Sequence, residues 1–314
     1  MRIIASAPGK LILFGEHASS RGRPAIVFAI NKRVTVTISK CNQHKILLTS
    51  NQYNVFQEEY PSMKLDMVSN LIATFFRKFE ISEKPLEIVI ESDLKSGFGS
   101  SAALIVALFG ALFTYFDIMP SKIEFLRICI EYNREFKGYG SGLDIASALY
   151  GGMIKYQTDR TPEALPFEKL KILIGNTKYK ASSGPIVQQV RDFEVKNPIE
   201  SRRIFDRIAE IVSEAEDAII ENDQRKLGNL MTENHRLLQQ IGVSSETLDK
   251  MIDASIRAGA YGAKLSGAGI GDNMLALVTT ETLEAVINAL NTSPGVAEAD
   301  IIIDSKGLDI KKEL

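Results

Sequence analysis

The sequence predicts an α+β fold with two domains, and three observations support this prediction. A chain of 314 residues exceeds the length that one hydrophobic core usually organises. Its 45 % apolar and 24 % charged residues are typical of a globular protein with a core of normal size. In the second half, a strand pattern precedes long helical patterns and further strands, an order typical of α+β domains. Prolines and charges cluster at 157–168, so we predict domains at 1–160 and 161–314.

The first forty residues predict a series of short strands. Apolar runs at 2–5 and 11–14 are separated by the small-residue segment Pro8-Gly9-Lys10, which we expect to form a loop. Two more strands are expected at 25–30 and 33–39. In the last of these, valine and isoleucine alternate with polar residues, which is the pattern of a half-buried strand.

The next elements alternate between sheet and helix. Residues 45–49 are expected to continue the sheet, and residues 51–65 to be irregular. From Met67 to Phe79, apolar residues recur at helical spacing, which predicts an amphipathic helix. A β-branched run at 86–90 then predicts another strand.

A small-residue loop, Gly97–Ala103, follows that strand and leads into an apolar run from Ala102 to Phe116. The run has 15 residues, fewer than the roughly 18 of a membrane span, so it predicts a buried helix. A loop of this kind leaves backbone N–H groups unpaired at the helix start, where the helix dipole favours an anion. The loop therefore predicts a phosphate-binding site.

The remaining elements are mostly helical. Ser121 is expected to cap a helix at 122–136, and the glycines of 138–142 to end it. A short helix at 144–150 and a strand at 153–156 complete the first domain. The second domain is expected to contain a strand at 171–174, helices at 183–194, 199–221, 224–240 and 245–258, a glycine-rich stretch at 262–271, a strand at 274–278, a helix at 282–291 and a strand at 299–304.

The loop Gly97–Ala103 has an alternative interpretation. Gly97, Gly99 and Ala102 match the G-x-G-x-x-A fingerprint of dinucleotide-binding folds. That fingerprint requires a βαβ unit with an acidic residue about 20 positions on, at the end of a second strand. The sequence predicts a second helix there, which argues against this fold. The Gly-Lys-Ser/Thr of a Walker loop is also absent from the segment.

Three Gly/Ser-rich segments lie next to charged or hydroxyl side chains, at 8–10, 97–103 and 264–272. One such segment is usually a turn, whereas three in one chain favour a polyanionic ligand. Lys10 belongs to the first, and Glu16 and His17 end the following strand, so these three side chains are expected on one rim. A lysine there is usually solvated, and a single histidine is more often structural.

Asp144 is the carboxylate best placed for chemistry. It follows three glycines and precedes an apolar segment, so we expect it near a helix N-terminus, where the dipole keeps a carboxylate ionised. Aspartate is also a common N-cap residue. A cap and a catalytic base are compatible, and both roles stay open at this point.

The charge balance and the cysteines limit the class of function. The net charge of −2 argues against a general nucleic-acid-binding protein, which needs excess Lys and Arg to neutralise phosphates. Cys41 and Cys129 form neither a CxxC pair nor a disulfide framework, which favours a reducing compartment. The three histidines lack metal-ligand spacing, and the N-terminus lacks a signal-peptide pattern. We therefore expect a cytoplasmic protein that binds neither nucleic acid nor membrane.

Together these segments resemble the GHMP kinases, the superfamily of galacto-, homoserine, mevalonate and phosphomevalonate kinases. Its first motif matches Ser6–Lys10 and Phe14–His17, its second Gly97–Ala103, and its third Gly262–Gly271. The motifs occur in the family's order and span nearly the whole chain. The resemblance implies an N-terminal domain like ribosomal protein S5 domain 2 and a ferredoxin-like C-terminal domain.

The resemblance also implies ATP and Mg²⁺ as cofactors and a small-molecule alcohol as the phosphoryl acceptor. It assigns catalysis to Asp144 and to Lys10, the lysine paired with it. It assigns ATP binding to Gly97, Phe98, Gly99, Ser100, Ser101 and Ala102, with Ser101 also a magnesium ligand. It assigns substrate binding to Glu16, His17, Ser141, Ser266, Gly267, Ala268 and Gly269. A homodimer is compatible with the family, although the sequence carries no signal for the assembly.

Two sets of features point to different acceptors. Gly15-Glu16-His17-Ala18 and the segment 234–265 resemble mevalonate kinases, as does the chain length, which implies mevalonate as the acceptor in isoprenoid biosynthesis. The segments 140–151 and 269–272 are more similar to phosphomevalonate kinases. Mevalonate kinases usually have a metal-binding glutamate eleven residues before the catalytic aspartate, where this chain has Asn133. A phosphorylated acceptor, another small alcohol and an inactive ligand-sensing relative remain the alternatives.

Overall fold

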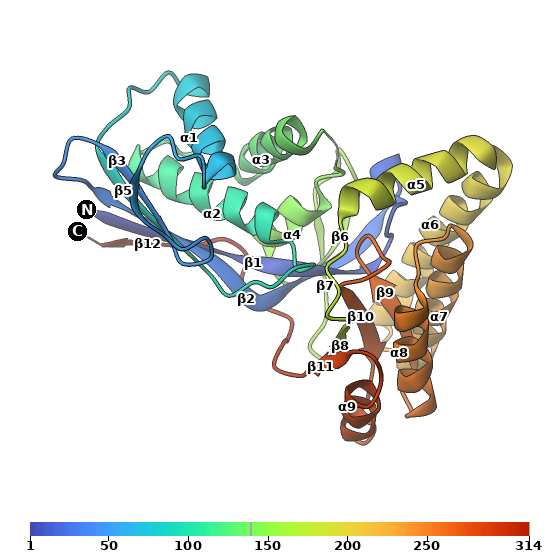
Figure 1. Cartoon of the computed structure of the whole chain (residues 1–314). Helices are drawn as coiled ribbons and strands as arrows, with labels where there is room; N and C mark the ends of the chain where they lie inside the picture. Colours follow the sequence, from blue (N-terminus) through green and yellow to red (C-terminus); the bar gives the residue numbers. More distant parts are fainter. Residues whose placement is uncertain (139, 314) are drawn as a thin grey trace. The chain divides into compact units, whose positions relative to one another are not determined.

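A computed structural model describes residues 1–138 and 140–313 of the chain (Figure 1). The chain forms two compact units that are not contiguous in sequence. Unit 1 comprises residues 1–9, 32–151 and those from 306 onward, whereas unit 2 comprises 10–31 and 152–305. This division differs from the predicted domains 1–160 and 161–314. The reason is that two long strands each contribute residues to both units, and that the C-terminal residues belong to unit 1.

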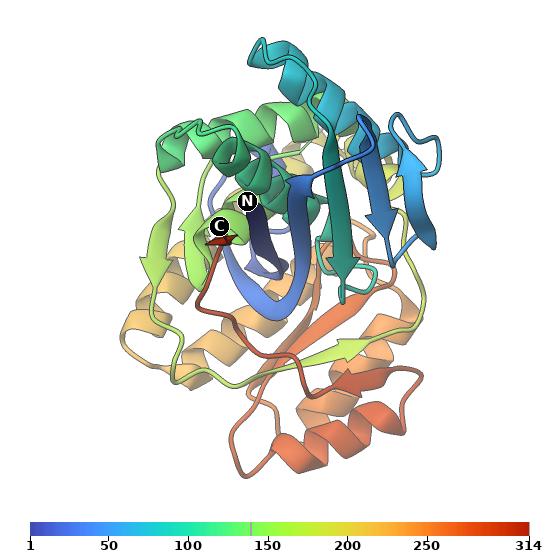
Figure 2. The same ribbon diagram turned by 90° about the vertical axis from the view of Figure 1, so that its left-hand side faces the viewer.

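The sheet of unit 1 is built on those two long strands. Its strands are β1 (Arg2–Phe14), β2 (Ala25–Lys40), β3 (Ile46–Ser50), β4 (Val55–Glu59), β5 (Leu86–Ser92) and β12 (Asp309–Glu313). Their order is β12-β1-β2-β5-β3-β4. β3 runs parallel to β5, whereas β12, β2 and β4 are antiparallel to β1, β5 and β3 respectively. Because β12 pairs with the first residues of β1, the two ends of the described chain lie side by side (Figure 2).

Helices cover one face of this sheet, as Figure 1 shows. They are α1 (Asp66–Lys78), α2 (Ser100–Tyr115), α3 (Lys122–Lys137) and α4 (Leu143–Tyr150). α2 is buried at every residue from Ala102 to Phe113, which agrees with its uniformly apolar sequence. The ring of Phe75 on α1 packs 5.1 Å from that of Phe113 and 5.9 Å from that of Phe109, measured between centroids. These aromatic contacts hold α1 against α2 and make α2 the centre of the unit 1 core.

The predicted loop at Pro8-Gly9-Lys10 is wrong, because these residues lie inside the continuous strand β1. β12 pairs only with Arg2–Ser6, so Pro8 lies beyond that pairing, and its missing N–H removes no bond to β12. The predicted pair of strands at 25–30 and 33–39 likewise forms the single strand β2.

Unit 2 contains a second, antiparallel sheet. The shorter elements of unit 2 as a whole are the 3₁₀ turn η1 (Ser19–Arg21) and the strands β6 (Met153–Tyr156), β7 (Glu163–Leu165), β8 (Ile172–Asn176), β9 (Gly262–Ser266), β10 (Asn273–Leu277) and β11 (Val296–Glu298). β8, β9, β10 and β11 form the second sheet in the order β11-β8-β10-β9. β6 pairs with Ala25–Phe28 of β2 and with β7.

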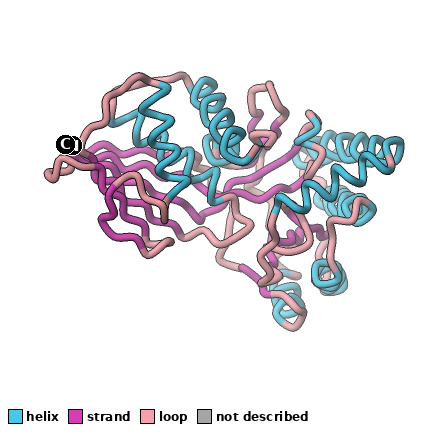
Figure 3. Tube along the Cα trace, turned by 45° about the horizontal axis from the view of Figure 1, so that its top comes forward, coloured by secondary structure: helices cyan, strands magenta, loops and turns pink. Residues whose placement is uncertain are grey.

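Long helices make up most of the rest of unit 2 (Figure 3). They are α5 (Ser183–Lys196), α6 (Pro198–Ile220), α7 (Gln224–Gln240), α8 (Glu246–Arg257) and α9 (Leu283–Asn291). α7 and α8 pack against β9. The approach of α7 to β9 requires two glycines, because a Cβ on Gly262 would lie 1.8 Å from the carbonyl oxygen of Gly228.

Two predicted segments differ from the structure. β4 lies in the segment predicted to be irregular, and the predicted strand at 299–304 is reduced to an isolated bridge between Ile30 and Ile303.

The segment from β5 to β6 is helical wherever the described residues form regular structure, so the βαβ unit of the dinucleotide-binding alternative is absent there. Over the described ranges, no helix combines the length and the apolar character needed to cross a membrane.

Candidate active site

In unit 1, the loop Gly97–Ala102 leads into α2 as predicted. Gly97 and Gly99 have φ of 83° and 79°, in the left-handed region that favours glycine, and Gly99 is the N-cap of α2. The carbonyl of Gly99 accepts from the N–H groups of Ala102 and Ala103, but no side chain caps the start of this helix. The buried Phe98 anchors the loop. The result is a helix start whose amides and dipole favour an anion.

Asp144 lies in the first turn of α4, half-buried. The N-cap of this helix is Gly142, with φ of 92°, so the alternative role of Asp144 as the N-cap is wrong. Ser141 precedes the helix, and its Oγ accepts a 3.4 Å hydrogen bond from the backbone N–H of Leu143. The carboxylate therefore lies at the positive end of a helix dipole while Gly142 and Ser141 shape the helix start.

Asn133 on α3 is a buried polar residue with an unsatisfied atom. Its side chain is 5 % exposed, and its Oδ1 has no hydrogen-bond partner among the described residues. A buried amide oxygen without a partner is costly and calls for a ligand such as water or a cation. α4 packs against both α2 and α3. Asn133, Asp144 and the phosphate loop are thus carried by three helices of one unit.

In unit 2, the turn after β1 is tied to β9 by a buried ion pair. Glu16 and Lys264 are both 0 % exposed, and the Nζ of Lys264 donates to Oε1 of Glu16. Burial raises the pKa of Glu16 and lowers the pKa of Lys264, and each charge opposes the shift of the other. The second oxygen of Glu16 has no partner among the described residues. The pair holds the predicted first motif against the third.

Ser266 makes a second tie between the same two motifs. Its Oγ donates to the carbonyl of Ile12 at 2.9 Å and accepts from the N–H of Ile12 at 3.0 Å. The side chain is buried. The hydroxyl of Ser266 is therefore used to hold β1 beside the end of β9.

His17 lies on the same turn and contacts the loop after β9. Its Nε2 is 3.0 Å from the carbonyl oxygen of Ala268. A carbonyl only accepts, so Nε2 carries the proton. Burial lowers the pKa of His17 to about 4, so the ring is neutral at pH 7 and its Nδ1 is a hydrogen-bond acceptor.

The loop after Ser266 has an unusual backbone. Gly267 and Gly269 have φ of 97° and 96°, and a Cβ on Gly269 would lie 2.0 Å from the carbonyl oxygen of Val243. The N–H of Ile270 donates to that same carbonyl at 2.8 Å. Ile270 itself has φ of 64°, which is strained for a β-branched residue. The carbonyl of Val243, between α7 and α8, thus holds the strained loop at Gly267–Ile270 in place.

The structure brings the predicted residues into two groups. Unit 1 holds Gly97–Ala102, Ser141 and Asp144, whereas unit 2 holds Lys10, Glu16, His17 and Ser266–Gly269. The predicted pairing of Lys10 with Asp144 joins residues of different units and stays a prediction.

Sequence reasoning missed several contacts in unit 2. It assigned no partner to Glu16, because the buried partner, Lys264, lies 248 positions away in the sequence. It also missed the contacts of Arg21 with Glu194 on α5. Buried charges in a sequence show no local pattern, so these pairs had no detectable signal.

Similarity to known proteins extends over nearly the whole chain. The GHMP kinases N terminal domain model matches residues 66–152 and the GHMP kinases C terminal model matches residues 215–296, together more than half of the chain. The mevalonate kinase of Methanothermobacter thermautotrophicus is 32 % identical, covering 98 % of this chain and 100 % of that protein. The mevalonate kinase of Pyrococcus furiosus is 32 % identical, covering 99 % of each chain. The structure of L. major mevalonate kinase in complex with R-mevalonate has a TM-score of 0.77 at 27 % identity, covering 95 % of this chain and 94 % of that one.

Proposed function

The chain belongs to the GHMP kinase family, and from this premise we propose that it transfers the γ-phosphoryl group of ATP to mevalonate, giving mevalonate 5-phosphate and ADP. The full-length similarity to proteins named mevalonate kinase supports this acceptor. One structural observation carries the choice between mevalonate and phosphomevalonate. It concerns the two arginines that follow His17.

Arg21 and Arg23 are both neutralised by carboxylates within unit 2. Arg21 pairs with Glu194 on α5, and Arg23 pairs with Asp206 on α6 at 2.6 Å. A site for a phosphorylated acceptor needs cations that are available to the phosphate. Because these two cations already have anionic partners, the turn that carries His17 suits an acceptor without a phosphoryl group. This observation disfavours phosphomevalonate.

The start of α2 is proposed to bind the phosphates of ATP. Its N-cap Gly99 has a left-handed backbone and no side chain to cap the first turn, and the helix dipole adds positive potential at the same end. Ser100 and Ser101 are half-buried in the first turn and supply hydroxyl groups. Phosphoryl transfer relies mainly on positioning and charge stabilisation of this kind.

The residues of unit 1 also suit a magnesium ion. Mg²⁺ in kinases is usually held by one or two protein oxygens together with phosphate oxygens and water. The orphaned Oδ1 of Asn133 and the hydroxyl of Ser101 are hard oxygen donors of this type. Within residues 1–138 and 140–313, no cluster of three or more His, Cys, Asp or Glu side chains could hold a metal. When bound, Mg²⁺ would neutralise charge on the triphosphate.

We assign the proton transfer to Asp144. Its carboxylate takes the proton of the acceptor hydroxyl as that oxygen attacks the γ-phosphorus, and the bond to the ADP oxygen breaks. We assign to Lys10 the role of offsetting the negative charge that develops during transfer. Both roles come from the family resemblance, and the position of Asp144 at the start of α4 supports its part.

Two of the predicted substrate-binding residues receive a different role. Glu16 is fully buried against Lys264, and the hydroxyl of Ser266 is hydrogen-bonded to the backbone of Ile12. We propose that both residues position the turn that carries His17 and do not contact the acceptor themselves. His17 and the loop Gly267–Gly269 remain the proposed acceptor contacts in unit 2.

A cytoplasmic location and a homodimer complete the proposal. Cys41 and Cys129 are both free and buried, which suits a reducing compartment. The homodimer rests on the family alone, and light scattering of the purified protein tests it: the mass of two chains supports the dimer and the mass of one chain contradicts it.

The acceptor is tested by release of ADP from ATP with mevalonate and, separately, with phosphomevalonate. We expect turnover with mevalonate and little or none with phosphomevalonate. Turnover with phosphomevalonate alone would overturn the proposed acceptor, and ATP binding without turnover on either alcohol would favour the ligand-sensing alternative.

A further inference from the structure

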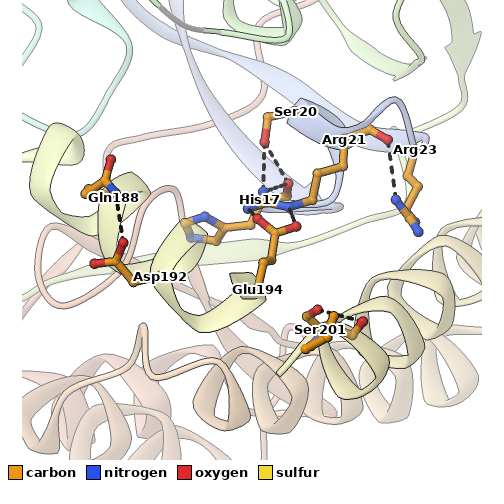
Figure 4. A network of polar contacts seen from close by, with 9 residues as sticks. His17, Ser20, Arg21, Arg23, Gln188, Asp192, Glu194 and Ser201 are labelled. Carbon is orange, nitrogen blue, oxygen red and sulfur yellow. Dashed lines mark hydrogen bonds and ion pairs between the residues drawn. The ribbon is translucent and has the colours of Figure 1, made fainter. Parts of the chain in front are cut away.

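Arg21 is the centre of a polar network that surrounds the turn carrying His17 (Figure 4). It lies at the end of η1, and its guanidinium meets a carboxylate from α5 in the two-point geometry typical of strong Arg–carboxylate pairs. Nε of Arg21 is 2.5 Å from Oε1 of Glu194, and Nη2 contacts Oε2 of the same residue. The side chains of Arg21 and Glu194 are 16 % and 31 % exposed. Such partial burial makes this pair stronger than an ordinary surface pair.

The third nitrogen of the guanidinium reaches the backbone of His17. Nη1 of Arg21 donates to the carbonyl oxygen of His17 at 2.7 Å, and Oγ of Ser20 donates to the same carbonyl at 2.8 Å. Nη1 also donates to Oγ of Ser20 at 3.0 Å. The carbonyl of His17 is therefore held by two donors, one of which is anchored to α5 through Glu194.

The backbone of His17 needs this support. Its φ is 60°, in the left-handed region that is unfavourable for most non-glycine residues. A strained residue persists only when its surroundings determine its conformation. The Arg21 guanidinium is itself fixed from a second side, because its Cζ lies 4.3 Å from the ring centroid of the buried Phe205 on α6. Contacts with α5 and α6 thus fix the position of the Arg21 guanidinium, and its hydrogen bond in turn fixes the backbone of His17.

We propose that Arg21 and Glu194 form a clamp that positions the His17 ring for the acceptor alcohol, so that the pair controls acceptor affinity without touching the acceptor. The backbone of His17 leads directly to its ring, and the ring is fixed at its other end by the carbonyl of Ala268. Loss of the clamp releases one of these two attachments. The Nδ1 of the ring then no longer points in one direction. This inference rests on the proposed function, since it assumes that His17 contacts the acceptor.

The clamp is tested with Arg21→Ala and Glu194→Gln, with Arg23→Ala as the matched control. Arg23 lies two residues away, pairs with Asp206 at 2.6 Å and donates to the carbonyl oxygen of Arg21 at 3.4 Å. Among the described residues, its side chain makes no hydrogen bond to His17. We expect KM for mevalonate to rise at least about tenfold in Arg21→Ala, and less in Glu194→Gln. KM for ATP is expected to stay within about twofold in both variants. Arg23→Ala is expected to leave both KM values unchanged.

A double-variant cycle separates the clamp from two independent effects. If Glu194 acts through Arg21, Arg21→Ala/Glu194→Gln resembles Arg21→Ala alone. Arg21→Lys is expected to fail as a rescue, because an ammonium group lacks the planar fork that serves Glu194 and His17 together. Full additivity of the two substitutions, or a wild-type KM for mevalonate in Arg21→Lys, would overturn the clamp.

A spectroscopic measurement tests the clamp independently of activity. The chain has three histidines, so ¹⁵N resonances of the imidazole rings can be assigned with His17→Asn as a reference. We expect a single tautomer with the proton on Nε2 for His17 in the unaltered protein and a mixture of tautomers in Arg21→Ala. Unchanged His17 resonances in a folded Arg21→Ala would overturn the clamp. Glu194→Gln serves as the second variant if Arg21→Ala does not fold. Absence of turnover with mevalonate in the unaltered protein would refute the proposed function instead, and the ring spectrum would still decide the clamp.

Discussion

Asp144 is the residue on which the proposed chemistry depends most. It occupies the first turn of α4, behind a left-handed glycine, where the helix dipole favours a carboxylate. We predict that Asp144→Asn lowers kcat by roughly 10²–10⁴-fold, because general-base assistance has this magnitude. ATP binding is expected to persist, since Asn keeps the size of the side chain and the phosphate loop is unchanged. Turnover measured as ADP release, with ATP affinity measured by calorimetry, checks both parts, and near-normal turnover would contradict the role.

His17 gives the protein a measurable dependence of stability on pH. Burial lowers its pKa in the folded state to about 4, below its ordinary value of 6.5. Between these values the unfolded chain binds more protons than the folded one, so acidification from pH 7 to pH 5 destabilises the protein. The contribution of His17 to this loss is up to about 2 kcal/mol.

Urea unfolding at pH 7 and pH 5, compared between the unaltered protein and His17→Asn, measures that contribution. Asparagine tolerates the left-handed backbone of this position, so the substitution removes the titrating group without adding strain. A smaller loss of stability is expected in His17→Asn. Some loss remains, because burial lowers the pKa of His235 as well. Equal losses in both proteins would show that His17 does not titrate in the way proposed.

At the scale of elements, the contact of α7 with β9 is the closest backbone approach that we describe. A Cβ on Gly262 would lie 1.8 Å from the backbone oxygen of Gly228, an atom that cannot rotate away. We predict that Gly262→Ala destabilises the protein by about 3 kcal/mol or more, because α7 and β9 must separate. The control is Gly138→Ala, where φ is 72° and the space is open, and where only about 1–2 kcal/mol of backbone strain is expected. Equal midpoints of urea unfolding for the two variants would contradict this account.

The helices were the elements that the sequence predicted best. α7 was predicted at 224–240 and extends from Gln224 to Gln240, because the spacing of its apolar residues is a local pattern. The α+β GHMP kinase fold is likewise confirmed. The charged strand β12 was not predicted, since Asp309–Glu313 lacks apolar alternation and forms a strand only through its pairing with Arg2–Ser6.

In the candidate site, too, local patterns were predictable from the sequence and long-range contacts were not. The loop Gly97–Ala102 at the start of α2 was predictable because a glycine-rich segment before an apolar helix is a local signal, and its phosphate-binding role stays a prediction. The partners of Glu16 and Arg21 were not, because they lie 248 and 173 positions away. Pro8-Gly9-Lys10 misled the prediction in the opposite direction: its composition is typical of a loop, yet the residues continue β1. Local sequence patterns therefore predicted the position of the loop before α2, whereas the contacts around the turn that carries His17 became visible only in the fold.

At the scale of the whole molecule, each compact unit carries one part of the family's motifs. Unit 1 carries the loop Gly97–Ala102, which we propose binds phosphate, at the start of α2, and Asp144 on α4. Unit 2 carries the turn with His17, the loop after β9 and the buried pair that ties them. In unit 2, Glu194 and Asp206 neutralise Arg21 and Arg23, which supports the proposed acceptor without a phosphoryl group.

The most direct measurement is the ³¹P NMR spectrum of the products formed from ATP and mevalonate by the purified protein. We predict one new phosphomonoester resonance, that of mevalonate 5-phosphate, growing in step with ADP and absent with Asp144→Asn. With phosphomevalonate in place of mevalonate, we predict no new diphosphate resonance. A diphosphate product from phosphomevalonate, with no monoester formed from mevalonate, would contradict the proposed function.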